Sequence, residues 1–339
     1  MSLKGMVRAE LSRLVQRYGY ELMDRASLYE WQKPSDTPLR SDGPTDPYLT
    51  ESNPRLLELR QRYAGFDPAV TTADLWTADY VSGDRLRYFR GHDAYLWQRI
   101  GPNMNEFGYV LATYYVRSID ALGLMSRVTD DTWFGNFTFT IDGTTVSRDM
   151  LDSIMELCFL ENHLHLSAIR DVRILDVGAG YGRLGHRTCE TIPSVADYVC
   201  VDAVAQSTFI SEFYLKFRKS RARVVALDEI DATLKTWTPD LAVNVHSFSE
   251  CRLEAIDWWL ALLARHGVRY LMIVPNDPWE DGRGTLITND RQDFSPLIAK
   301  RGYTLVAHEP KYRDPIVQRY AINPTHYYLF ELTSPRSTV

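Results

Sequence analysis

Three glycines follow directly after an apolar run in the segment RILDVGAGYGRLGHR, residues 173–187. Gly178, Gly180 and Gly182 stand behind Asp176 at the spacing G-x-G-x-G, and a helical pattern begins after them. Glycine lets a backbone turn tightly and approach a ligand closely, because no Cβ is in the way. In an open α/β sheet such a turn lies at the carboxyl end of the first strand, where ligands bind. We therefore predict a ligand-binding loop at this position, with a plain tight turn as the alternative.

Two carboxylates beyond the loop indicate the kind of ligand. Asp202 ends the next predicted strand about 20 residues after the central glycine, where an acidic side chain accepts hydrogen bonds from the hydroxyls of an adenosine ribose. Asp228, just past the third predicted strand, is a candidate for the adenine edge. The dinucleotide motif has the spacing G-x-G-x-x-G, which differs from this loop. The pattern therefore favours a nucleoside ligand and points away from NAD.

Three side chains that could take part in catalysis follow two later strands. His246 ends the fourth predicted strand in LAVNVHSFSE, and its usual pKa near 6.5 suits a general base. Glu250, four residues on, could orient that imidazole or bind a substrate hydroxyl. The fifth strand ends in VPNDPWED, which places Asn276 and Asp277 at the same edge of the sheet. The alternatives are that His246 only hydrogen-bonds its loop and that the Asn-Asp-Pro segment is a turn.

The same carboxylates could in principle bind a metal. Glu250 and Asp277 carry oxygen ligands of the kind that Mg²⁺ takes. No pair of adjacent aspartates stands at a strand end, as a dedicated magnesium site would have. We therefore predict no metal site and leave dependence on Mg²⁺ open.

The elements that must position these residues alternate between strands and helices in the carboxyl-terminal half. Strands are predicted at 172–177, 198–202, 223–227, 241–246, 270–275, 303–307 and 326–332, and helices at 182–191, 205–218, 251–266 and 294–301. Such alternation is typical of a mostly parallel, doubly wound sheet. The last two strands are separated by a predicted loop without a helix, so we expect them to pair as an antiparallel hairpin.

The amino-terminal half has a different pattern. Helical periodicity is present at 3–24, 54–63, 92–100 and 106–122, and a proline-rich loop covers 31–54. An Asp-Gly pair between two β-branched runs predicts a hairpin at 137–146, after which Ser147 caps a helix that runs to Leu164. We expect residues 1–150 to form a mainly helical cap that shapes an acceptor pocket, and residues 151–339 to form the catalytic domain.

The overall composition narrows the class of protein. The chain has 339 residues, of which 45% are apolar and 24% charged, and its net charge is −6. This balance excludes disordered and collagen-like chains, and the negative charge disfavours a nucleic-acid partner. No apolar run approaches the roughly 18 residues of a membrane span, and the amphipathic start lacks a secretory segment. We expect a cytoplasmic protein, and a homodimer is left open.

The motifs resemble those of one enzyme family. LDVGAGYG followed by VDAV is similar to the class I S-adenosylmethionine-dependent methyltransferases, over about residues 170–332. More narrowly, ILDVGAGYGRLGHR, NVHSFSE and NPTHYYLFEL resemble the sugar O-methyltransferases. The resemblance implies a Rossmann-like sheet of seven strands and S-adenosylmethionine as cofactor. It also implies that the cofactor is bound by residues Asp176, Gly178, Ala179, Gly180, Tyr181, Asp202, Ala203 and Asp228.

The function that follows is methyl transfer to a hydroxyl of a sugar, glycoside or oligosaccharide, with His246 as the base and Glu250 and Asp277 beside it. Aromatic residues make up 12% of the chain, and we expect several early ones to line the cleft above His246, where they could stack on sugar rings. The candidates are Trp76, Tyr80, Tyr88, Trp97, Tyr114, Tyr115, Trp133 and Phe134. The alternatives are a methyltransferase acting on another small molecule, an NAD-dependent oxidoreductase, and a nonenzymatic cofactor-binding subunit.

Overall fold

The computed structural model describes residues 10, 11, 13–15, 17, 18, 43–72, 75–77, 80–91, 94–99, 103–276 and 284–333. Most of the predicted helix at 3–24 and the first half of the loop at 31–54 lie outside these residues. Asp277, one of the catalytic candidates, also lies outside them. Among the described residues, no helix has both the length and the apolar character needed to cross a membrane.

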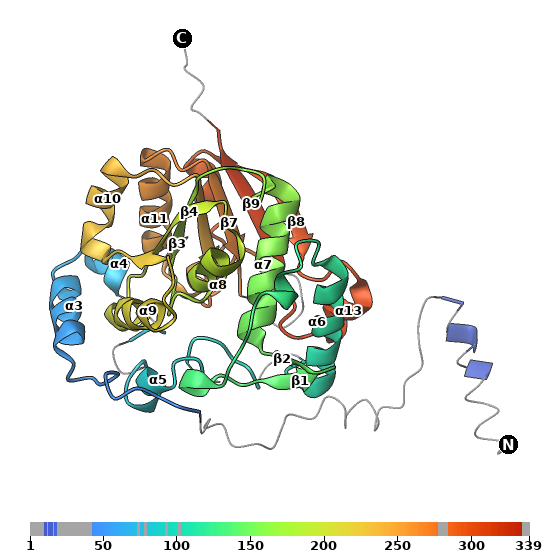
Figure 1. Ribbon diagram of the computed structural model, residues 1–339. Coiled ribbons are helices and arrows are strands. Elements are labelled where there is room, and N and C mark those ends of the chain that lie inside the picture. The colour runs from blue at the N-terminus through green and yellow to red at the C-terminus, as the bar shows by residue number, and fades with distance from the viewer. Residues whose placement is uncertain are drawn as a thin grey trace, which may run out of the picture.

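A seven-stranded sheet forms the centre of the molecule (Figure 1). Its order is β5-β4-β3-β6-β7-β9-β8, and every neighbouring pair is parallel except the two that contain β9. The strands are β3 (Val172–Val177), β4 (Val195–Val201), β5 (Arg223–Val224), β6 (Leu241–Val245), β7 (Tyr270–Val274), β8 (Tyr303–Pro310) and β9 (His326–Leu332). This is the predicted Rossmann-like methyltransferase sheet, with its terminal antiparallel hairpin.

Helices cover both faces of the sheet. They are α3 (Pro54–Ala64), α4 (Pro68–Thr71), α5 (Asp84–Arg87), α6 (Glu106–Ile119), α7 (Arg148–Leu164), α8 (Arg183–Thr191), α9 (Ala205–Phe217), α10 (Ile230–Thr236), α11 (Leu253–Arg265), α12 (Ser295–Lys300) and α13 (Pro315–Tyr320). Along β3, Leu175 and Val177 belong to one apolar core and Ile174 to the other. Successive side chains of a strand point to opposite faces, so a strand buried on both sides reads as one continuous apolar run.

Short helical turns and a small hairpin complete the described chain. The turns are η1 (Leu124–Ser126), η2 (Trp133–Gly135), η3 (Leu227–Glu229) and η4 (Ser247–Glu250). The hairpin pairs β1 (Phe139–Ile141) with β2 (Thr144–Val146), as predicted. Its two turn residues, Asp142 and Gly143, have φ of 49° and 74°, the positive values that a primed turn requires.

Three predicted elements were wrong. Residues 94–99 form turns and bends where a helix at 92–100 was expected, and the helical turn in this region is α5. The third strand is two residues long, because η3 and then α10 turn the chain away from the sheet. Helix α13 lies between the last two strands, where only a loop was expected. Its start has a readable signal, since the Asp314 side chain caps it and Pro315 is its first residue.

Helix α7 carries ionised side chains into the interior. Asp149, near its start, is 1% exposed and accepts hydrogen bonds from Arg90 and Arg187. Arg90 is also buried and donates to Asp130 over 2.6 Å and to Asp131 over 2.8 Å. These guanidinium groups hold the pKa of Asp149 well below its usual range, against the effect of burial. Segments from three parts of the chain therefore meet at one buried carboxylate.

Two more carboxylates of α7 are buried one and two turns further along. Asp152 pairs with Lys311, which precedes α13, over 2.5 Å and with Arg148 over 3.0 Å. Glu156 accepts two hydrogen bonds, of 2.8 and 2.9 Å, from Arg183 at the start of α8. Helix α7 thus holds the glycine-loop helix on one side and the segment between β8 and β9 on the other.

Breaking this network should be costly. Replacing Asp149 by Ala leaves Arg90 and Arg187 buried beside an empty position, so the free energy of unfolding should fall by about 3–5 kcal/mol. Asp197→Ala removes the partner of Arg223, whose side chain is 42% exposed, and should cost about 0–1 kcal/mol. Urea unfolding of both variants measures the difference. Equal decreases in the free energy of unfolding of the two variants would contradict the prediction that the buried network is more costly to break than a surface ion pair.

Candidate functional site

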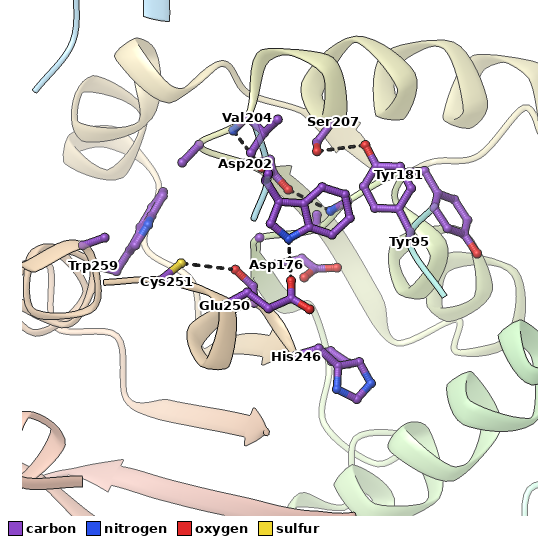
Figure 2. Close-up of a pocket in the computed structure, with 18 of the residues that line it drawn as sticks. Tyr95, Asp176, Tyr181, Asp202, Val204, Ser207, His246, Glu250, Cys251 and Trp259 are labelled. Carbon is purple, nitrogen blue, oxygen red and sulfur yellow. Dashed lines mark hydrogen bonds between the residues drawn. The ribbon is translucent and has the colours of Figure 1, made fainter. Parts of the chain in front are cut away.

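A cavity opens at the carboxyl ends of β3, β4 and β6, where the sequence placed the ligand loop (Figure 2). The inner wall comes from the loops that follow these strands and includes Asp176, Gly180, Asp202 and His246. The outer wall comes from earlier in the chain and includes α4 and the side chains of Trp76, Tyr95 and Leu96. Helix α11 closes the remaining side with Ala255 and Trp259.

The glycines of the loop are required by both backbone conformation and space. Gly178 has φ of +72°, and a Cβ there would lie 2.1 Å from the Ser247 hydroxyl oxygen. Gly180 has φ of +56°, and its Cβ would lie 3.0 Å from the ring of Tyr95. Any other residue would therefore strain the backbone at both positions, and it would collide with Ser247 at position 178 and press against Tyr95 at position 180. The loop is a cradle that leaves its backbone exposed to whatever fills the cavity.

Asp202 is the first residue after β4, and both of its carboxylate oxygens accept backbone hydrogen bonds. The amide of Gly180 donates to one over 2.9 Å, and the amide of Val204 donates to the other over 2.8 Å. A carboxylate has about four acceptor positions, so two remain for a ligand. Burial raises the pKa of Asp202 to about 7. Asp202 therefore both fixes the glycine loop and presents acceptors to the cavity.

Asp176 is the second buried carboxylate of the cavity. It is 3% exposed and accepts one hydrogen bond, of 2.9 Å, from the hydroxyl of Tyr198 on β4. Burial raises the pKa of Asp176 to about 7. It lines the cavity together with the glycine loop, and β3 ends one residue later, at Val177.

His246 follows β6 in a strained conformation. Its φ is +67°, a region that non-glycine residues rarely adopt and that is common at functional sites. Its amide donates to the carbonyl of Val274 over 2.7 Å, which holds this conformation in place. The imidazole Nδ1 is buried and has no hydrogen-bond partner among the described residues. Burial, together with the positive charge of Arg148, lowers the pKa of His246 to about 3, so the ring is neutral at neutral pH.

Glu250 is held by two neutral donors from opposite sides. The indole Nε1 of Trp76 donates to one oxygen over 2.5 Å, and the side-chain amide of Asn276 donates to the other over 2.7 Å. Burial raises the pKa of Glu250 above its usual value. No hydrogen bond between Glu250 and His246 is present, so the carboxylate does not orient the imidazole in this conformation. Instead it ties the outer wall of the cavity to the end of β7.

The structure does not bring Asp228 to the cavity. Its carboxylate forms a bidentate ion pair with Arg62 of α3, with hydrogen bonds of 2.9 and 2.6 Å. This pair attaches α3 to the turn η3, so the residue expected at the adenine edge has a structural contact instead. Ala179, Tyr181 and Ala203 line the cavity as the resemblance implied. No group of three His, Cys, Asp or Glu side chains that could hold a metal lies within the described residues.

The expectation about the early aromatic residues was mostly wrong. Of the eight named, only Trp76 has a place in the cavity wall. Trp133 and Phe134 pack instead against Phe217 of α9, with ring centroids 5.3 and 4.9 Å away. Their position is decided by apolar packing against α9, a helix far along the chain. The sequence of the early segment does not indicate this contact.

Tyr95 is the wall residue that the sequence did not reveal. Its ring stacks on Trp76 at 4.8 Å, and its hydroxyl is 2.9 Å from the hydroxyl of Ser207 on α9. It is one tyrosine of 20, in a segment without regular structure, so no spacing marks it. Together Trp76 and Tyr95 contact the loop after β3, helix α9 and the turn after β6, which closes the cavity over the glycine loop.

The charge of the cavity is unusual. Asp176, Asp202 and Glu250 all line it, and in Figure 2 the three side chains lie around the same space. Within the described part of the chain, none of the three forms an ion pair. Buried carboxylates are normally paired with a cation, because burial without one is costly. Arg183, which is paired with Glu156, and the exposed Arg252 also line the cavity, and the three carboxylates keep acceptor positions for a ligand that carries positive charge and hydroxyl groups.

Comparisons with known proteins find similarity to solved structures only. No family model and no curated protein matches the sequence. Among solved structures, an S-adenosylmethionine-dependent methyltransferase from Clostridium acetobutylicum is 11% identical, with a TM-score of 0.37 over 54% of this chain and 90% of that chain. The magnesium protoporphyrin IX methyltransferase from Synechocystis, with bound S-adenosylhomocysteine, is 11% identical, with a TM-score of 0.41 over 65% of this chain and 99% of that chain. Likenesses of this size leave substrate and reaction open.

Because the pKa of Asp176 is raised, the stability of the ligand-free protein should depend on pH. A carboxyl whose pKa is about 7 in the folded state favours folding while it is protonated, and this contribution is lost as the pH rises from about 4 through 7. Asp176→Asn removes the titration and can still accept the Tyr198 hydrogen bond. The stability of the variant relative to the wild type should therefore be higher at pH 8 than at pH 5, as measured by thermal unfolding at the two pH values. The surface variant Asp197→Asn is the control.

A stability difference between Asp176→Asn and the wild type that is equal at pH 5 and pH 8 would refute the raised pKa of Asp176.

Proposed function

We propose that this protein is an S-adenosylmethionine-dependent O-methyltransferase whose acceptor is a hydroxyl of a saccharide or glycoside. The observation that carries the proposal is the cavity itself, in which a glycine cradle and three carboxylates that form no ion pair with any described residue surround one space. The fold, with its strand order and terminal hairpin, agrees with that activity. The saccharide acceptor rests on the sequence resemblance.

The charge of the cavity favours S-adenosylmethionine over a dinucleotide. That cofactor carries a sulfonium, an ammonium and one carboxylate, so its net charge is positive, whereas NAD carries a negatively charged pyrophosphate. Asp176, Asp202 and Glu250 attract the first ligand and repel the second, and the effect is strong where water is excluded. The G-x-G-x-G spacing points the same way.

The residues of the cavity can be given roles on this proposal. Asp202 accepts the ribose hydroxyls, and Asp176 with the backbone of Gly178 and Gly180 holds the methionine end. When bound, the cofactor supplies an electrophilic methyl carbon. The protein positions the acceptor oxygen in line with that carbon and receives the hydroxyl proton.

His246 is the proposed proton acceptor. Its imidazole is neutral and lines the cavity, and its buried Nδ1 has no competing hydrogen-bond partner among the described residues. The lowered pKa makes it a weak base in the empty cavity. Its strained backbone and its place at the end of β6 support a positioned group.

A methyltransferase for a small acceptor other than a sugar is the second candidate. The observation in its favour is that seven of the eight aromatic residues expected to stack on sugar rings lie outside the cavity wall. The outer wall still comes from residues 70–96, which supports a proposed role for the amino-terminal half in shaping the acceptor pocket.

Direct binding tests the cofactor. Titration calorimetry should detect S-adenosylmethionine binding and no NAD binding, for the electrostatic reason above. Incubation with methyl-labelled S-adenosylmethionine and a panel of saccharides, glycosides and phenols should then identify the acceptor class. Absence of S-adenosylmethionine binding would refute the proposal, and label transfer only to phenols would replace the saccharide by the second candidate.

Asp202→Asn should lower the affinity for S-adenosylmethionine by at least about tenfold. The amide has one acceptor oxygen for the two backbone N–H groups and the two ribose hydroxyls, and its NH₂ group faces other donors. Calorimetry at pH 8, where the wild-type carboxyl is ionised, measures the loss. Asp197→Asn, at the surface, should bind as the wild type does; an unchanged affinity in Asp202→Asn would remove the ribose role.

His246→Ala should lower the rate of methyl transfer by about 100-fold or more and leave cofactor affinity within a few-fold, because the imidazole acts on the acceptor. Single-turnover transfer of the labelled methyl group and calorimetry separate the two effects. Full turnover by the variant would show that another group receives the proton.

A further inference from the structure

The roles proposed above for single residues do not include one for Glu250. We propose that Glu250 makes the cavity selective for the positively charged sulfonium of the cofactor over the neutral thioether that remains after methyl transfer. This inference rests on the proposed function, since it concerns the same cavity and the same ligand.

The position of Glu250 is fixed from both sides. Trp76 donates to one oxygen and Asn276 to the other, so the carboxylate cannot turn away from the cavity without losing a hydrogen bond. Both donors are neutral, and they orient the negative charge without cancelling it. An oriented and uncancelled charge discriminates between ligands by their own charge.

Elimination assigns the sulfonium to Glu250. The cofactor offers three groups to anionic side chains: the ribose diol, the ammonium and the sulfonium. Asp202 is tied to the glycine loop at the end of β4, where the ribose is expected, and Asp176 lies beneath the loop, where the methionine end is expected. Glu250 belongs to the turn η4 after β6, on the same inner wall, and Figure 2 shows it between Asp202 and His246. The reacting sulfur must lie between the ribose and the proposed base.

The aromatic wall strengthens the interaction. The stacked rings of Trp76 and Tyr95 cover the glycine loop next to Glu250 and exclude water from that side. A carboxylate and a cation attract each other several times more strongly in such a place than in water. Trp76 also gives Glu250 its hydrogen bond, so one residue both shields the charge and directs it.

The reaction changes the charge that Glu250 meets. As the acceptor oxygen forms its bond to the methyl carbon, the S–CH₃ bond breaks and its electron pair stays on sulfur, which becomes a neutral thioether. The hydroxyl proton passes to His246. Once His246, whose pKa is low, has released that proton, Glu250 faces a neutral sulfur and is partly desolvated, which is unfavourable. The product cofactor should therefore bind more weakly than the substrate cofactor.

Three ligands of equal shape and different charge test the inference. Calorimetry at pH 8 would measure Kd for S-adenosylmethionine, for sinefungin, in which a protonated amine replaces the methylsulfonium, and for S-adenosylhomocysteine, the neutral thioether. The wild type should bind both cations at least about tenfold more tightly than the thioether. In Glu250→Gln this ratio should fall to about two, chiefly by weaker binding of the cations.

The Glu250→Gln variant should keep its fold. The introduced amide retains an oxygen for the Trp76 indole, and the Asn276 amide can turn to present its oxygen to the new NH₂ group. Thermal unfolding without ligand checks this. Glu254→Gln, which removes an exposed carboxylate at the start of α11, is the matched control and should keep the wild-type ratio. Trp76→Phe keeps a ring but loses the donor, so the ratio should fall part of the way.

The outcomes separate the two proposals. If none of the three ligands binds the wild type, the proposed function fails. If all bind and the wild type does not prefer the cations, or if Glu250→Gln keeps the full preference, the role of Glu250 is refuted and the proposed function stands.

Discussion

Helix α7 brings three carboxylates into the interior, and their cationic partners come from the amino-terminal half, from α7 itself, from α8 and from the segment before α13. Asp149 binds Arg90 from the amino-terminal half and Arg187 from α8, and it also accepts a 2.6 Å hydrogen bond from Tyr181 in the glycine loop. Glu156 holds Arg183, at the start of α8. A buried carboxylate tolerates loss of its partners poorly, so these contacts hold the loop, its helix and the early segment in one arrangement.

The same helix also determines the outer wall. Arg148 donates to the carbonyl of Trp97 over 2.5 Å, and this fixes the segment that carries Tyr95 and Leu96. The fixed segment then closes over the loop through the contacts of Tyr95 with Gly180 and Ser207. Contacts with one rigid helix thus hold both walls of the cavity in place. A site that aligns two reactants needs such rigidity.

The two sets of buried charges differ in a way that bears on function. The three buried carboxylates of α7 each have a cation; Arg90 and Arg187 keep the pKa of Asp149 low, and Lys311 and Arg148 keep that of Asp152 low. In the cavity the carboxylates have only neutral donors among the described residues, and burial raises the pKa of Asp176 and Asp202 to about 7. The first set stabilises the fold, and the second costs stability that a cationic ligand would restore. Perturbed pKa values in a cleft are typical of functional sites.

The sequence by itself determined the sheet, the terminal hairpin, the glycine loop and the position of Asp202. These depend on local properties of the chain: apolar periodicity, turn chemistry, and glycines at backbone angles that other residues avoid. Only the tertiary structure decided that Asp228 pairs with Arg62, that Trp76 and Tyr95 form the wall, and that Glu250 is held by Trp76 and Asn276. It also decided the low pKa of His246, which follows from burial and from charges on α7 and α8. Such properties arise where side chains far apart in sequence come within a few ångströms, and no pattern along the chain specifies that distance.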